Sequence, residues 1–379
     1  MRGNWFTSYH FFNKTRKQRE ERKEREERAF YENGSLLLEK LIASCNGKPI
    51  PIRTFSAQQL LLATNNYSSE LLRGRWVHWY KGSLEGRIVL IKRFDYALPS
   101  LAINDLVFSA QMSGHSNVLK PIGCCLHTPC PILVYEFAAN GFLADRIFVF
   151  PVTKRQHQPM VWERRLKIAR QIAHALSYLH TAFPRPVIHM YIDMRSEADV
   201  EVYQFSVESI RFVAPELKAT GKVTEKTDVH SFGRLLLELL TGEDPYNITR
   251  LKIDEDSSLV AYIHNRAQGS CINEIVDPAI LAEDGEGGAS LEHQLQAVLD
   301  LALTCTEEDP QRRPTMVDVT KQLRRIERFT KTGEELGENL QNLKLLESVE
   351  EHASASLKRN VSSDEIQKVK EVSERPLEV

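Results

Sequence analysis

Residues 214–233 read APELKATGKVTEKTDVHSFG, and this stretch carries the strongest fold signal in the chain. The run that begins at Asp228 opens a helix that we predict over 228–241. Gly242 and Pro245 follow closely and end that helix, because glycine and proline disrupt the helical pattern. The stretch therefore predicts a helix-rich region in the second half of the chain.

Further helices are predicted on both sides of this stretch. Upstream, apolar residues recur every three or four positions between Trp162 and His180, and the pattern stops before Pro184 and Pro186. Downstream, with a break at Pro310, we predict helices over 258–268, 291–305 and 315–328.

The strand signal lies earlier in the chain. Two short apolar runs, 88–91 and 132–135, are flanked by Gly or Pro and predict strands, and residues 101–112 predict a helix between them. Strands early and helices late indicate an α+β fold, in which a small sheet-rich lobe precedes a larger helical lobe.

Composition and charge narrow the class of protein. The 379 residues are 42% hydrophobic and 26% charged, as in an ordinary soluble globular protein, and the net charge of −2 gives no drive toward nucleic acid. Six cysteines without C-x-x-C spacing favour a reducing cytoplasmic compartment. Cys125, His127 and Cys130 are close together, but no fourth ligand lies nearby, so we expect no metal site. No apolar run is long enough to cross a membrane.

Residues 1–54 are predicted to form an N-terminal extension with a charged helix over 14–28. Opposite charges four residues apart support this helix, in the pairs Arg16–Glu20, Glu21–Arg25 and Glu24–Arg28. The simplest interpretation is an exposed helical extension.

Two other features of the chain ends are informative. An aromatic cluster between residues 5 and 12 precedes the charged helix, and its alternative function is a foot on an anionic membrane surface. Residues 330–379 are rich in Glu and Lys and lack aromatics, so we predict a disordered or marginally helical tail.

Seven short motifs occur in a fixed order along residues 55–329. They are Tyr80-Lys81-Gly82, Val89-Leu90-Ile91-Lys92, Leu133-Val134-Tyr135-Glu136-Phe137, Val187-Ile188-His189, Ala214-Pro215-Glu216, Thr227-Asp228-Val229-His230-Ser231-Phe232-Gly233 and Arg313-Pro314-Thr315-Met316. In this order the motifs resemble a protein kinase. The resemblance implies a bilobal kinase fold, with a small lobe over about 55–137 and a helical lobe over about 138–329.

Three other stretches, 33–48, 63–67 and 123–126, resemble plant receptor-like cytoplasmic kinases related to the wall-associated kinases. The nearest subgroup is that of pseudokinases that serve as adaptors for a coiled-coil NLR immune receptor. This resemblance implies a cytoplasmic protein that bridges an NLR receptor and receptor-like cytoplasmic kinases in plant defence. From the hydropathy and the charge we expect no transmembrane segment and no nucleic-acid partner. Peripheral association with the plasma membrane, for example through a partner, stays an alternative.

The nucleotide-binding parts of the kinase pattern are degraded. The three glycine positions of the phosphate loop hold Leu72, Gly74 and Val77, although close approach of the backbone to phosphate needs glycine. Lys92 matches the phosphate-binding lysine. Vestigial ATP binding would therefore rest on Lys92 and Gly74.

Two further residues bear on the same site. The helix position that pairs with the lysine holds Asp105, whose side chain is one methylene shorter than that of glutamate. Two alternatives follow: Lys92 forms an ion pair with Asp105, or its ammonium group lies in water. Leu90 stands where kinases place a small alanine against the adenine, so it fills part of that pocket.

The catalytic loop departs furthest from the pattern. After His189, the position of the catalytic aspartate holds Tyr191, a phenol with a pKa near 10 that cannot act as the hydroxyl-orienting base. The metal-binding asparagine position holds Ser196, and the first position of the metal-binding DFG motif falls on Gln204. Asp193 and Asp199 are the alternative carboxylates, but neither lies at the required spacing.

The segment after this loop is short as well. Ala214 follows His189 after 25 residues, where active kinases have roughly forty.

The residues that the resemblance assigns to architecture are retained. Glu216 and Arg313 match a pair that fixes the end of the activation segment, Asp228 matches the residue that holds the catalytic-loop backbone, and His189 is interpreted as a packed structural residue. We therefore expect a pseudokinase that binds other proteins and requires no cofactor. The alternatives are a residual ATP-binding switch with weak ATP affinity, a weak serine/threonine kinase, and a decayed gene product.

Overall fold

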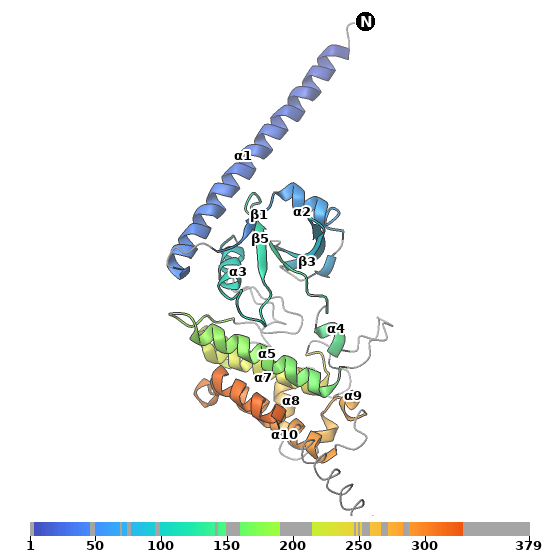
Figure 1. Cartoon of the computed structure of the whole chain (residues 1–379), viewed down its shortest axis with the longest axis vertical. Helices are drawn as coiled ribbons and strands as arrows, with labels where there is room; N and C mark the ends of the chain where they lie inside the picture. Colours follow the sequence, from blue (N-terminus) through green and yellow to red (C-terminus); the bar gives the residue numbers. More distant parts are fainter. Residues whose placement is uncertain are drawn as a thin grey trace, which may run out of the picture.

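The computed structural model describes most of the chain up to residue 328. The described ranges are 4–45, 50–68, 70–73, 77–94, 99–140, 143–148, 160–189, 214–245, 248, 251, 258–266, 272–282 and 288–328. Within them, a sheet-containing lobe is followed by a helical lobe (Figure 1). The two lobes have the α+β arrangement that the sequence predicts.

The small lobe is built on one mixed sheet of six strands in the order β1-β5-β6-β4-β3-β2. The strands are β1 (Arg53–Thr54), β2 (Glu70–Arg73), β3 (Val77–Leu84), β4 (Arg87–Phe94), β5 (Pro121–Cys125) and β6 (Ile132–Glu136). β1 runs parallel to β5, and the other neighbours are antiparallel. The predicted strands over 88–91 and 132–135 lie within β4 and β6.

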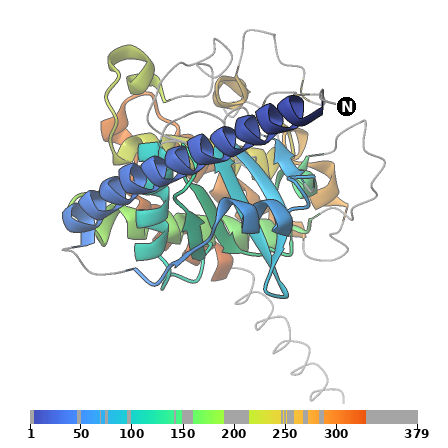
Figure 2. The same cartoon turned by 90° about the horizontal axis from the view of Figure 1, so that it is seen from above.

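Three helices belong to this lobe: α1 (Asn4–Cys45), α2 (Ala57–Ala63) and α3 (Pro99–Gln111). α2 begins with a capping box, in which the Ser56 hydroxyl accepts from Gln59 N–H and the Gln59 side chain accepts from Ser56 N–H. α3 packs against α1 on one side and against strands of the sheet on the other. Seen from above, α1 crosses over this lobe and extends beyond it (Figure 2).

The large lobe is helical in its described parts. It contains α4 (Ala144–Ile147), α5 (Trp162–Thr181), α6 (Pro215–Thr220), α7 (Glu225–Thr241), α8 (Leu259–Arg266), α9 (Pro278–Leu281), α10 (Gly288–Cys305) and a helix over 316–328. Two 3₁₀ turns, Ile272–Glu274 and Pro310–Arg312, connect these helices. The quoted stretch thus spans α6 and the first half of α7.

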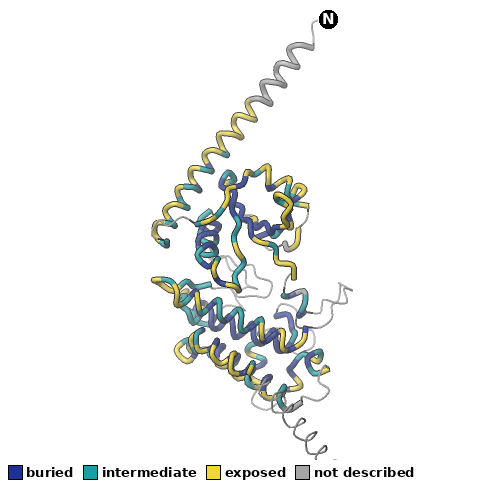
Figure 3. Tube along the Cα trace, viewed as in Figure 1, coloured by how far each residue is buried: buried dark blue, intermediate teal, exposed yellow. Residues whose placement is uncertain are grey.

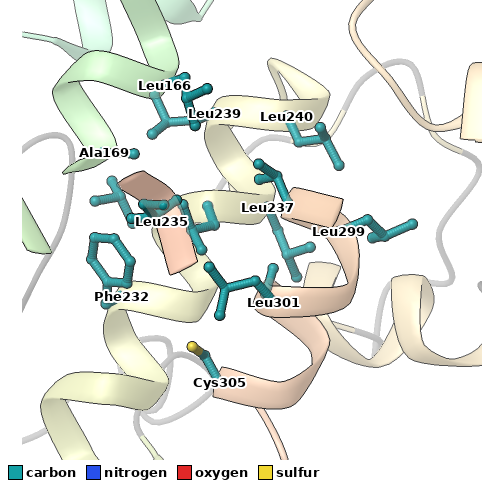
Figure 4. Packing of buried hydrophobic residues seen from close by; sticks show 14 of the residues in the cluster. Leu166, Ala169, Phe232, Leu235, Leu237, Leu239, Leu240, Leu299, Leu301 and Cys305 are labelled. Carbon is teal, nitrogen blue, oxygen red and sulfur yellow. The ribbon is translucent and has the colours of Figure 1, made fainter. Parts of the chain in front are cut away.

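α7 forms the centre of the large lobe. Its residues from Thr227 to Thr241 are all buried, and Gly242 ends it in the left-handed conformation. Phe232, Leu235 and Leu239 pack with Leu166 of α5 and with residues of α10 such as Leu299 (Figure 4). Because α7 is buried on every side, other elements must surround it, which explains its central place.

The structure changes two predictions about the N-terminal extension. The helix runs over Asn4–Cys45 instead of 14–28, and the ion pairs along its described part include Lys17–Glu21, Arg22–Glu26 and Lys23–Glu27. The side chain of Arg16, and with it the predicted pair Arg16–Glu20, lies outside the described residues. The Arg25 guanidinium donates to the backbone oxygen of Glu21 instead of its carboxylate.

The boundary at residue 54 also does not separate the extension from the lobe. β1 pairs with β5, and Phe30, Leu37 and Leu41 pack against the core of the small lobe. Burial along α1 agrees with this packing: residues in the middle of the helix are exposed, and intermediate and buried residues appear nearer its C-terminal end (Figure 3).

The tail over 330–379 lies outside the described residues, as do the side chains of the aromatic cluster between residues 5 and 12. Among the described helices, none combines the length and the hydropathy that crossing a bilayer requires.

Candidate functional site

Lys92 lies on β4 and forms an ion pair with Asp105 of α3. Its Nζ is 2.8 Å from Asp105 Oδ2, and the two side chains are 6% and 24% exposed. The other oxygen, Asp105 Oδ1, accepts from the Ser109 hydroxyl at 3.1 Å. Of the two alternatives, the structure therefore places the lysine head in the pair and not in water.

Aromatic rings surround the same ammonium group. Lys92 Nζ lies 5.4 Å from the ring centroid of Trp79 and 5.0 Å from that of Phe94, within the range of a cation–π interaction. The Trp79 ring in turn lies 5.7 Å from that of Tyr135 on β6. The Asp105 carboxylate and the rings of Trp79 and Phe94 together compensate the positive charge of Lys92.

Apolar residues fill the sheet beside this pair. Leu90 shares the strand face of Lys92 because side chains alternate along a strand, and it lies opposite Tyr135 in the β4–β6 register. Leu90 and Val77 are buried in one core cluster with Tyr135. A purine ring on this face of the sheet would have to compete with that packing.

Two of the three glycine-loop positions are strand residues. Leu72 on β2 pairs with Trp79 on β3, and Val77 begins β3 and is 1% exposed. Gly74 lies outside the described residues. At these two positions the backbone therefore belongs to a sheet ladder and its neighbouring core.

Asp228 lies at the start of α7 and is completely buried. Its Oδ2 accepts from the backbone N–H of His189 at 2.8 Å and lies 2.8 Å from His180 Nε2. The carboxylate thus joins α7, the end of α5 and the start of the segment that follows His189. Within the described residues, His189 Nδ1 is buried without a hydrogen-bond partner.

The residues beyond His189 on which catalysis would depend lie outside the described ranges. These are Tyr191, Ser196 and Gln204, together with the alternative carboxylates Asp193 and Asp199.

Glu216 and Arg313 form a bidentate pair in the large lobe. Both guanidinium Nη atoms lie 2.9 Å from the two carboxylate oxygens of Glu216, and the Arg313 side chain is 0% exposed. Arg313 also donates to the backbone oxygens of Lys226 and Glu307. The pair therefore ties α6, the first turn of α7 and the turn before Pro310 into one unit.

The cysteine and histidine cluster on the small lobe is packed. Cys125 is buried, and its burial raises the pKa of the thiol. The His127 ring stacks on Phe30 at 4.6 Å between centroids. In the part of the chain that the structure describes, no three His, Cys, Asp or Glu side chains gather as a metal site would require.

Sequence reasoning missed two buried polar residues. Arg165 donates to the backbone oxygens of Met160 and Leu239 and pairs with Asp277 at 2.6 Å. Asn33 on α1 donates to two backbone oxygens in the β5–β6 connection. A signal existed for Arg165, because it precedes Leu166 on the apolar face of the helix predicted between Trp162 and His180, where a charge needs a partner.

Comparisons with known proteins agree with this geometry. The family model of protein tyrosine and serine/threonine kinases matches residues 66–196 and 190–323. The two matches overlap at residues 190–196, between His189 and Ala214.

Several Arabidopsis thaliana proteins are similar over most of the chain. Non-functional pseudokinase ZED1 is 37% identical over 331 residues, which are 79% of this chain and 96% of that protein. Serine/threonine-protein kinase ZRK1 is 35% identical over 338 residues, 81% of this chain and 94% of that protein. Wall-associated receptor kinase-like 4 is 34% identical over 349 residues, but these are only 43% of its length. With its two lobes, its Lys92–Asp105 pair and these relatives, the chain belongs to the protein tyrosine and serine/threonine kinase family.

Proposed function

We propose that the protein is a catalytically inactive kinase homologue that acts as a protein-binding adaptor in plant immune signalling. Its partners on this proposal are an NLR immune receptor and receptor-like cytoplasmic kinases. It works in the cytoplasm, reaches the plasma membrane through a partner, and needs no cofactor.

One observation carries the proposal. The Asp228 carboxylate accepts from His189 N–H, and this bond supports the assignment of His189 to the start of the catalytic loop. Two residues further on, the position of the catalytic aspartate holds Tyr191. A phenol has neither the charge nor the pKa to orient and deprotonate a substrate hydroxyl at neutral pH. The chemistry is therefore lost while Asp228 and the Glu216–Arg313 pair keep the architecture.

The relatives support the inactive class without deciding it. ZED1 is named as a non-functional pseudokinase, whereas ZRK1 is named as a serine/threonine-protein kinase. The Lys92–Asp105 pair favours the second candidate function, a residual ATP-binding switch or weak kinase, because an intact lysine–carboxylate pair is part of an active nucleotide site.

Affinity purification from plant leaf tissue tests the adaptor function. The tagged full chain and its Lys92→Ala variant are purified in parallel, and the proteins recovered with each are quantified by mass spectrometry. We expect an NLR receptor or receptor-like cytoplasmic kinases at near-stoichiometric amounts with both chains. Partners lost in Lys92→Ala, while circular dichroism shows an intact fold, would favour the nucleotide switch. Recovery of chaperones alone would contradict the adaptor function.

A further inference from the structure

α3 is buried over an unusually wide arc. Six of its residues are buried, namely Leu101, Ala102, Ile103, Leu106, Val107 and Ala110. At 3.6 residues per turn these positions cover more than half of the helix circumference. A helix that packs only on a sheet buries one stripe, so a second element must cover the outer side of α3.

The second element is the C-terminal part of α1. Phe30, Leu37, Leu41 and Cys45 recur at helical spacing and pack against the core cluster that contains Ile103 and other residues of α3. α1 and α3 lie side by side along this part (Figures 1 and 2). Each apolar group removed from water here favours the docked helix by about 25 cal/mol per Å².

A second apolar stripe of α1, about 100° around the helix from the first, is exposed. Tyr31, Leu38 and Ile42 recur with the spacing i, i+7 and i+11 and are 73%, 58% and 58% exposed. α1 is therefore attached to the lobe through one stripe, and the position of that stripe decides how α3 is covered.

Asn33 fixes the register of this attachment. It is 2% exposed, and its Nδ2 donates to the backbone oxygens of Leu126 and Thr128, both at 2.9 Å. The neighbouring Phe30 ring stacks on His127 of the same connection at 4.6 Å. If α1 shifted by one residue along the β5–β6 connection, the buried Asn33 amide would lose its two acceptors and its donors would be left unsatisfied.

The covered helix α3 carries Asp105, whose side chain is one methylene shorter than glutamate. For its carboxylate to lie 2.8 Å from Lys92 Nζ, α3 must remain close to β4. We propose that residues 29–45 of α1 act as an intramolecular clamp that holds α3 against the sheet and keeps the Lys92–Asp105 pair closed. This clamp is independent of the adaptor function, because it concerns the chain alone.

Hydrogen exchange of the full chain, followed by mass spectrometry, tests the clamp. In Asn33→Ala both amide donors are lost, and we expect exchange in α1 residues 29–45 and in α3 to rise about tenfold or more. Ser35→Ala changes an exposed residue of the same helix and serves as the matched control, with exchange no faster than in the wild type because alanine also favours helix over serine. Faster exchange in α1 with unchanged exchange in α3 would overturn the proposal, and so would no change in either helix.

Gly34→Ala provides the opposite test in case Asn33→Ala does not fold. A Cβ at Gly34 meets no atom within 4 Å, and alanine favours helix over glycine, so α1 is stabilised without a clash. We expect slower exchange in both α1 and α3, together with less acetylation of the Lys92 amine by acetic anhydride. Slower exchange confined to α1 would show that α1 does not hold α3, and the proposal would fail.

Discussion

Arg313 shows how much of the large lobe depends on one side chain. Its guanidinium is completely buried and donates to Glu216 and to the backbone oxygens of Lys226, Glu307 and Glu308. Replacing it removes the only charge that compensates the Glu216 carboxylate among its described contacts. Buried pairs of this kind are expensive to break from one side.

We therefore expect Arg313→Met to lower the free energy of unfolding by about 3–5 kcal/mol in a denaturant titration. Arg312→Met is the adjacent control, because the Arg312 side chain is 73% exposed and its nearest Glu307 oxygen is 3.9 Å away. That change should cost less than about 0.5 kcal/mol. Equal losses in the two variants would contradict the structural role of the Glu216–Arg313 pair.

His230 predicts a pH dependence of stability. Burial first, and then the positive charges of Arg313, Arg234 and Lys218, lower the pKa of His230 from 6.5 to about 3. The folded protein thus keeps this imidazole neutral, whereas the unfolded chain binds a proton below its ordinary pKa. Stability from this group is present above pH 6.5 and is lost as the pH falls toward 3.

The measurement is the free energy of unfolding of the wild type and His230→Gln between about pH 6.5 and pH 4. The wild-type value should fall more steeply, by about 1.4 kcal/mol per pH unit, than that of the variant. Parallel curves would mean that His230 is neutral or charged to the same extent in both states.

At the scale of elements, the contact between α7 and α10 depends on one glycine. A Cβ added at Gly233 would lie 2.7 Å from Cys305 Cβ and 2.7 Å from Thr306 Cγ2, closer than such atoms approach in proteins. The two helices can therefore lie as close as they do only because residue 233 has no side chain.

Gly233→Ala should destabilise the protein by about 1–3 kcal/mol, although alanine is the better helix former. Gly114→Ala is the control, since a Cβ there meets nothing within 4 Å and the residue lies outside any helix. Thermal unfolding compares the two, and an unchanged melting temperature of Gly233→Ala would show that the helices separate at little cost.

Elements with a strong apolar period could be predicted from the sequence, and α1 shows why others could not. α7 was expected over 228–241 and begins at Glu225, because the Thr224 capping box adds a turn that periodicity does not reveal. In α1, charge pairs indicated only part of the exposed helix. The packed part depends on Asn33, whose two acceptors lie in a connection 93 and 95 residues away, and local pattern carries no information about such contacts.

At the scale of the whole molecule, the order of the motifs is enough to predict the kinase fold. It does not predict which contacts Lys92 makes at the nucleotide site. The sequence left open whether Asp105 reaches Lys92, because that depends on how close α3 lies to β4. The position of Trp79 against Lys92 likewise follows from the β3–β4 register and could not be seen in a motif. Phe94 lies two residues further along β4, on the same strand face as Lys92.

The packing around Lys92 predicts weak nucleotide binding. Because Leu90 is packed in the core and the Trp79 and Phe94 rings lie against Lys92 Nζ, Mg-ATP has to displace existing contacts. At about 1 mM Mg-ATP, a dissociation constant weaker than 1 mM stabilises the folded state by less than about 0.4 kcal/mol. We expect a change of melting temperature below about 1 °C, and a rise of several degrees would favour the ATP-binding switch.

The proposed loss of phosphoryl transfer is tested most directly by incubating the full chain with Mg²⁺ and γ-labelled ATP, alone and with a basic protein substrate, beside the Lys92→Ala variant. The structure and the Tyr191 position predict equal background label for both chains. Label that the wild type incorporates and Lys92→Ala does not would show an active kinase and contradict the inactive-adaptor account.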